Sequence, residues 1–144
     1  MRVYLDTNAY LSYLLKPLST SPPSALVRAG LSGDFTILIG DPTVREIIDK
    51  ATGKPYLAGH IAREDVDDFL SLLLDQAERI QDAPTIIPAV CRDRKDDYLL
   101  TYSLIGHADY LVSGDKDLLD LGRVEDLNIV TPAEFLALLE AEAR

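Results

Sequence analysis

The sequence is poor in the residues that build disulfide frameworks, zinc sites and broad cationic surfaces. It has one cysteine (Cys91) and two histidines among 144 residues. A single cysteine excludes an internal disulfide framework and fits a reducing compartment. These three scattered residues do not make a zinc site, so any metal would be bound by oxygen ligands. There are 14 basic against 24 acidic residues, a formal net charge of −10, which argues against a protein that coats DNA regardless of sequence.

Long apolar runs and leader patterns are also missing. No apolar stretch is long enough to span a membrane, and the chain starts with a strand pattern rather than a basic and apolar leader. We therefore expect a cytoplasmic protein without a membrane partner. Hydrophobic residues make up 47% and charged residues 26% of the chain, as in folded soluble domains. The length predicts a single domain over residues 1–144.

Strand and helix patterns alternate along the chain. Strands are expected at residues 2–5, 35–40, 110–113 and 127–130, with helices at about 9–15, 24–31, 43–51, 98–105 and 132–142. A further helix is expected from Glu64 to about residue 80, with an apolar stripe formed by Val66, Phe69, Leu70, Leu73, Ala77 and Ile80. This alternation predicts an α/β fold, a three-layer α/β/α sandwich around a mostly parallel sheet.

Acidic residues fall where such a sheet places its ligands. Asp6 ends the first strand, Asp115 follows the strand at 110–113, Glu46 lies one turn into a helix, and Asp96 and Asp97 begin another. Parallel strands end at the same edge of a sheet, so these carboxylates are expected to converge there. Converging carboxylates repel unless a cation neutralises them, and hard oxygen ligands select Mg²⁺ or Mn²⁺. The chemistry that this arrangement suits is metal-dependent phosphodiester hydrolysis.

Each acid also has an ordinary structural explanation. Asp6 and Asp115 are suited to capping helices, and Asp96 and Asp97 are favourable in a first helical turn. Glu46 could be a solvated residue of an amphipathic helix. A single acid of this kind is more often structural than functional, whereas the whole set at sheet-edge positions is harder to explain by chance.

The ordered set of short motifs resembles the PIN-domain family, and within it the VapC-like ribonucleases that are toxins of bacterial and archaeal toxin–antitoxin pairs. The motifs are Val3-Tyr4-Leu5-Asp6-Thr7-Asn8, Glu46, Cys91-Arg92-Asp93-Arg94-Lys95-Asp96-Asp97, the segment 108–119 and Thr131-Pro132-Ala133-Glu134-Phe135-Leu136. The resemblance covers essentially the whole chain. One departure is Ser113, where the family more often has threonine; the hydroxyl is retained.

The resemblance implies a functional assignment for particular residues. Catalytic metal ligands would be Asp6, Glu46, Asp96 and Asp115, binding one or two Mg²⁺ or Mn²⁺, with Asp97 as an auxiliary ligand. The polar residues that orient the carboxylates or a bound water would be Asn8 and Ser113. The implied activity is an endoribonuclease acting on an RNA substrate, held in check by a cognate antitoxin protein.

Basic residues beside these acids are candidates for holding the RNA backbone. They are Arg92, Arg94, Lys95 and Lys116, and each taken singly is also compatible with ordinary surface charge. The helix beginning at Glu64 carries Leu72 and Leu74 beside its main stripe, so it is apolar more than half-way round. Such a helix is deeply buried or covered by a second subunit, which favours a homodimer.

Two other functions are compatible with parts of the sequence. One is a catalytically inactive PIN-like binding module that acts through protein association. The other, a phosphatase or nucleotide hydrolase, is weaker because there is no GxxxxGK[ST] phosphate loop. In addition, Asp6-Thr7-Asn8 lacks the second aspartate, two positions on, of the aspartate-nucleophile phosphatases.

Overall fold

The computed structural model describes residues 1–81 and 94–143, and of residues 94–96 only the backbone. The strands are β1 (Arg2–Leu5), β2 (Thr36–Gly40), β3 (Glu78–Ile80), β4 (Tyr110–Val112), β5 (Arg123–Val124) and β6 (Leu127–Val130). The helices are α1 (Thr7–Leu15), α2 (Pro22–Leu31), α3 (Asp41–Gly53), α4 (Pro55–His60), α5 (Arg63–Gln76), α6 (Arg94–Ile105), α7 (Lys116–Leu119) and α8 (Pro132–Glu142).

The strands form one sheet in the order β3-β2-β1-β4-β6-β5. Every pairing is parallel except the short hairpin of β5 with β6. From β1 the chain first builds the sheet outward through β2 and β3, and it then returns to place β4 on the other side of β1. The strand order therefore reverses between β1 and β4, where open α/β sheets bind their ligands beyond the carboxyl ends of the strands.

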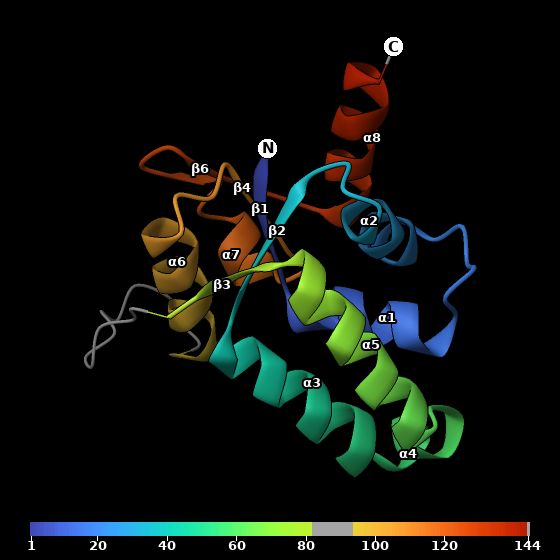
Figure 1. The fold of residues 1–144 in the computed structure, drawn as a ribbon. Helices are drawn as coiled ribbons and strands as arrows, with labels where there is room; N and C mark the ends of the chain where they lie inside the picture. The colour runs from blue at the N-terminus through green and yellow to red at the C-terminus, as the bar shows by residue number, and fades with distance from the viewer. Residues whose placement is uncertain (82–93, 144) are drawn as a thin grey trace.

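The two faces of the sheet are covered by different helices (Figure 1). Val3 and Leu5 point to one face and join the larger core, which α1, α2, α3, α5 and α8 complete. Tyr4 lies between them in sequence and points to the opposite face, where α6 and α7 pack. This alternation along β1 produces the predicted three layers, and the α/β fold class is confirmed.

The helix expected from Glu64 to about residue 80 is shorter in the structure. Val66, Phe69, Leu70 and Leu73 are the buried face of α5, as expected, but α5 ends at Gln76. Ile80 belongs instead to the edge strand β3, which pairs with β2. The spacing of Ile80 continues the helical period of α5 by chance. Periodicity alone cannot distinguish such a three-residue strand from a further turn of helix. The two-residue strand β5 was also not predicted.

Helix α6 begins at Arg94, four residues earlier than expected, and so includes both predicted acids of its first turn. Cys91, Arg92 and Asp93 lie outside the described residues. Within the part of the chain that the structure describes, no helix is both long and apolar enough to cross a membrane.

Candidate active site at the carboxyl edge of the sheet

Asp6 lies at the point where β1 passes into α1, beside the end of β4. Its backbone N–H donates to the carbonyl oxygen of Val112 at 3.0 Å, which joins the ends of the two central strands. Asp6 occupies the N-cap position of α1, yet its side chain makes no capping hydrogen bond. Its carboxylate oxygen Oδ2 accepts a hydrogen bond of 2.8 Å from the hydroxyl of Ser113 instead. The helix-cap explanation of this aspartate is therefore not supported by the geometry.

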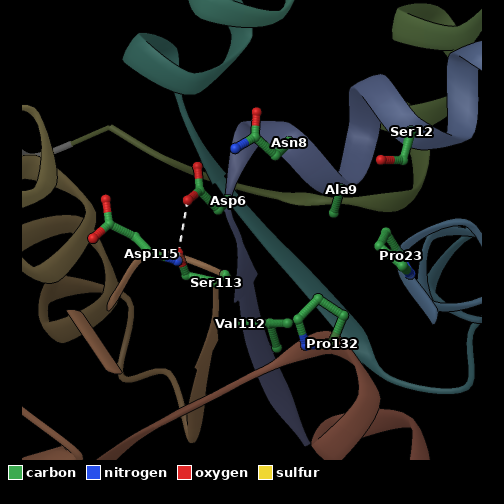
Figure 2. Close-up of a pocket in the computed structure, with 10 residues that line it drawn as sticks. Asp6, Asn8, Ala9, Ser12, Pro23, Val112, Ser113, Asp115 and Pro132 are labelled. Atoms are coloured by element: carbon green, nitrogen blue, oxygen red, sulfur yellow. Dashed lines mark hydrogen bonds between the residues drawn. The ribbon is translucent and has the colours of Figure 1, made fainter. Parts of the chain in front are cut away.

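The Ser113 hydroxyl links Asp6 to Asp115. It donates to Asp6 and accepts the backbone N–H of Asp115 at 3.0 Å. Ser113 is itself buried, with 2% of its surface exposed, so this arrangement is held by the packing at the end of β4. Asp6, Asn8, Ser113 and Asp115 line one pocket of about 280 Å³ at this edge of the sheet, and Figure 2 shows their side chains gathered at one end of it.

Asp115 has a structural role as well. Its Oδ1 accepts the backbone N–H of Asp117 at 2.8 Å and so caps the short helix α7. The capping explanation thus holds for one of its oxygens. The same carboxylate still lines the pocket with Asp6, so capping fixes its orientation and does not remove it from the site.

Glu46 is brought towards Asp6 by a buried contact on the other face of the sheet. The Tyr4 hydroxyl lies 2.8 Å from Thr43 Oγ1 and accepts the backbone N–H of Gly40 at 3.0 Å. These bonds tie the first turn of α3 to β1, and burial raises the pKa of Tyr4 to about 12, so the hydroxyl stays neutral. Glu46 lies one turn further along α3, as the sequence predicts, but it does not line the pocket of Asp6 and Asp115.

Both oxygens of Glu46 have protein partners. Lys50 lies one turn further along α3, and its ammonium is 2.6 Å from Oε1. The hydroxyl of Tyr98, on α6, donates to Oε2 at 2.5 Å. Burial pushes the pKa of Glu46 up, but the hydrogen bonds from Lys50 and Tyr98 outweigh it, and the pKa lies below its usual value.

Asp6 has the opposite electrostatics. Burial raises its pKa above the usual value, and the negative charge of Glu46 adds to this effect. The hydrogen bonds from the Ser113 hydroxyl and from the backbone of Thr7, together with the charge of Lys50, oppose the rise without cancelling it. An ionised Asp6 is therefore costly in the metal-free protein, and a cation placed beside it would relieve that cost.

The other predicted ligands are less fully described. Asp96 lies in the first turn of α6, and its side chain is outside the description. Asp97, beside it, is buried, with 2% of its surface exposed. Among the described side chains no group of three or more histidine, cysteine, aspartate or glutamate residues is placed to hold a metal ion.

Of the predicted RNA-binding residues, the structure describes one side chain. Lys116 is exposed at the start of α7, directly after Asp115. The side chains of Arg94 and Lys95, like all of Arg92, lie outside the description.

The donor set present is compatible with a hard cation. Mg²⁺ commonly binds through one or two carboxylates and keeps several waters, so it needs no cage made only of protein groups. Asp6 and Asp115 supply two carboxylates at one pocket, and the Asn8 amide oxygen is a third hard donor type there. A thiol or imidazole set for zinc is not found among the described residues.

Sequence reasoning missed Lys50 and Tyr98. Lys50 follows Glu46 by four residues, a spacing that pairs side chains on a helix, so this ion pair could have been found. Tyr98 is separated from Glu46 by 52 positions, and nothing local in the sequence indicates that α6 packs there.

Comparisons with known proteins agree with this architecture. The PIN domain family model matches residues 2–117. A solved structure described as VapBC2 from Rickettsia felis, bound to a DNA fragment from its promoter, matches with a TM-score of 0.58 and 16% identity, covering 91% of this chain and 98% of that one. Among curated proteins no match was found. The family match covers the first four strands and both aspartates of the pocket, and on this evidence the chain belongs to the PIN domain family.

Proposed function

We propose that this protein is a divalent-metal-dependent endoribonuclease and the toxin of a toxin–antitoxin pair. The observation that carries the proposal is the state of Asp6, a half-buried carboxylate at the switch point of the sheet that caps no helix. It is oriented by Ser113, and it shares a pocket with Asp115. A position that makes the charge of an aspartate unfavourable does not stabilise the fold, and such positions are concentrated at functional sites.

In this proposal each acidic residue has a defined part. Asp6 and Asp115 would bind Mg²⁺ or Mn²⁺ directly, and Glu46 and Asp96 would complete the ligand set, with Asp97 as an auxiliary. When bound, such an ion stabilises charge on a phosphodiester and lowers the pKa of coordinated water. Ser113 would orient the Asp6 carboxylate through its hydrogen bond to Oδ2, and Asn8, which lines the same pocket, offers an amide group there.

The proposed partners are an RNA substrate, an antitoxin protein and a second copy of the chain, all in the cytoplasm. The structural neighbour is described as a VapBC complex, which supports an antitoxin partner. Leu72 on α5 is 47% exposed while its neighbours pack into the core, and this supports a homodimer contact through α5. The residues proposed to contact the RNA backbone are Arg92, Arg94, Lys95 and Lys116.

The direct test is cleavage of total bacterial RNA with Mg²⁺ or Mn²⁺ supplied separately. We expect discrete products that need the metal, disappear with a chelator and are lost in Asp6→Asn. Asp34→Asn is the matched control, because Asp34 is exposed and precedes β2, at the opposite end of the strands from Asp6. Cleavage that persists in Asp6→Asn, or that needs no metal, would contradict the proposal of a metal-dependent ribonuclease with Asp6 in its active site.

The alternative, a binding module without activity, is favoured by one observation. The charge of Glu46 is already balanced by Lys50, and its other oxygen accepts a hydrogen bond from Tyr98, as in a scaffold that no longer binds a cation. Titration of the protein with Mn²⁺ separates the two functions. A binding module would take up Mn²⁺ weakly and equally in the wild type and in Asp6→Asn, whereas the ribonuclease would bind it through Asp6.

A further inference from the structure

We propose that a second pocket, at the far end of α1, binds a nucleotide of single-stranded RNA that flanks the cleaved position. This inference rests on the proposed function and names a substrate subsite for it. The pocket has a volume of about 400 Å³, within the range of ligand sites. It is lined by Ser12, Leu15, Lys16, Ser19, Ser21, Ser24, Tyr56 and His60.

The pocket adjoins the candidate active site. Ser12 lines both pockets, and Figure 2 shows it on α1, beyond Asn8 and Ala9 from the carboxylates. Asn8 and Ser12 are four residues apart and so lie on one side of α1, and Lys16 follows as the residue that ends the helix. The rise of a helix separates the first and last of them by about 12 Å. A strand of a few nucleotides lying along this side would reach both pockets.

An exposed aromatic pair forms one wall. Tyr56 is 67% exposed, and its ring lies 4.3 Å, centroid to centroid, from that of His60 at an interplanar angle of 33°. The His60 Nδ1 atom is 2.7 Å from the Tyr56 carbonyl oxygen, which fixes the imidazole. Leu57 between them is buried and anchors α4. The result is a supported aromatic surface, the kind on which unpaired bases stack at about 1–3 kcal/mol each.

The charge of the lining suits a polyanion despite the acidity of the whole protein. None of the residues lining this pocket is acidic, although the chain has 24 aspartates and glutamates. Lys16 is exposed and, among the described residues, forms no ion pair. A lysine that is not neutralised, beside an aromatic surface, supplies the phosphate contact that single-stranded nucleic acids use.

The loop before α2, which also lines the pocket, is held in place by hydrogen bonds within the chain. Arg28 donates to the carbonyl oxygens of Pro17 and Ser19, each at 2.7 Å, and thereby fixes the loop before α2. Ser24 is fully buried, and its hydroxyl has no hydrogen-bond partner among the described residues. Hydroxyl-rich walls favour a ribose–phosphate ligand over an apolar protein segment, for which an apolar groove would be expected.

The test is binding measured with cleavage prevented. A fluorescein-labelled, mixed-sequence single-stranded RNA of 12 nucleotides is titrated with the full chain in EDTA, and anisotropy is recorded at several salt concentrations. Tyr56→Ala should weaken binding about tenfold, the equivalent of 1.4 kcal/mol, whereas Tyr56→Phe keeps the ring and should bind as the wild type. Lys16→Gln should weaken binding and reduce the salt slope by about 0.7.

Arg123→Gln is the control for charge, because Arg123 lies on the edge strand β5 and is exposed. It should bind as the wild type. Ultraviolet crosslinks from the bound RNA should map to Tyr56 or its neighbours on α4. Equal binding by Tyr56→Ala and wild type, equal weakening by Lys16→Gln and Arg123→Gln, or crosslinks only to other segments would overturn the subsite.

The outcome is separable from that of the proposed function. Binding that depends on Tyr56 without any metal-dependent cleavage would support the subsite and count against the ribonuclease. Cleavage that depends on Asp6, together with RNA binding that ignores Tyr56, would support the ribonuclease and overturn the subsite.

Discussion

Replacing Asp6 by asparagine should stabilise the metal-free protein and remove its stabilisation by metal. Burial and the charge of Glu46 raise the pKa of Asp6, so its ionised form costs free energy in the native state. Asparagine removes that charge and keeps an oxygen that accepts from the Ser113 hydroxyl. Relief of such functional strain typically contributes about 1 kcal/mol to stability.

The size of the metal effect follows from linkage. Mn²⁺ at 100 times its dissociation constant stabilises a protein that binds it only when folded by about 2.7 kcal/mol. For 144 residues the unfolding entropy is about 0.3 kcal/mol/K, so the wild type should gain roughly 9 °C in Tm. Without metal, Asp6→Asn should melt about 3 °C above the wild type.

Thermal unfolding followed by circular dichroism, with EDTA and with Mn²⁺, measures both effects. The Asp34→Asn control should follow the wild type in each condition, because its exposed side chain is at the opposite end of the strands. A metal-dependent gain in Asp6→Asn equal to that of the wild type would refute the assignment of Asp6 as a ligand. A lower Tm of the variant in EDTA would refute the electrostatic argument.

Three further predictions concern the groups around Asp6, and a fourth concerns the packing of α6 on the sheet. Mn²⁺ affinity should fall as the pH drops through the raised pKa of Asp6, because protonation removes a ligand; titration calorimetry across pH checks this. Ser113→Ala removes a hydrogen bond that favours the carboxylate, so the pKa of Asp6 should rise further and Mn²⁺ binding should be lost at a higher pH. Ser113→Thr keeps the hydroxyl and should bind Mn²⁺ with the pH dependence of the wild type. Tyr98→Phe frees one oxygen of Glu46 and should tighten Mn²⁺ about fivefold if the lost hydrogen bond is worth about 1 kcal/mol; unchanged affinity would place Glu46 outside the ligand set. Gly40→Ala should destabilise the fold, measured by urea unfolding, because a Cβ there would lie 2.5 Å from a buried tyrosine ring of α6.

The sheet was predictable because its strands are short apolar runs bounded by clear turn and helix signals. Residues 2–5 and 127–130 were predicted with their observed bounds, and Asp6 followed directly as a strand-end residue. The strand β3 was not predictable from its own residues. Only Ile80 of its three positions is buried, and its pairing with β2 is a tertiary contact that no local pattern encodes.

The candidate site was predictable in its residue types and less so in its contacts. The alternation of strands and helices predicts that Asp6 and Asp115 lie at one edge of the sheet, and in the structure both line one pocket. The hydrogen bond from Tyr98 to Glu46 depends on where α6 lies relative to α3 once both pack on the sheet. Such packing is decided by side chains far apart in the chain, so the sequence predicted the acid and not the group that holds it.

Asp6 and Glu46 repel each other when both are charged, and their surroundings shift their pKa values in opposite directions. Asp6 is left with a raised pKa, whereas Glu46 is charged and held between Lys50 and Tyr98. A cation that entered beside Asp6 would attract Glu46, but it would have to compete with both of these partners. Of the proposed ligands, Glu46 is therefore the one whose binding to a cation would depend on the rest of the fold. Any movement of α6 that withdraws Tyr98 would lower the cost of freeing Glu46 from its present partners. Asp6 forms no ion pair among the described residues, so in the proposed site it is the ligand on which metal binding would first depend.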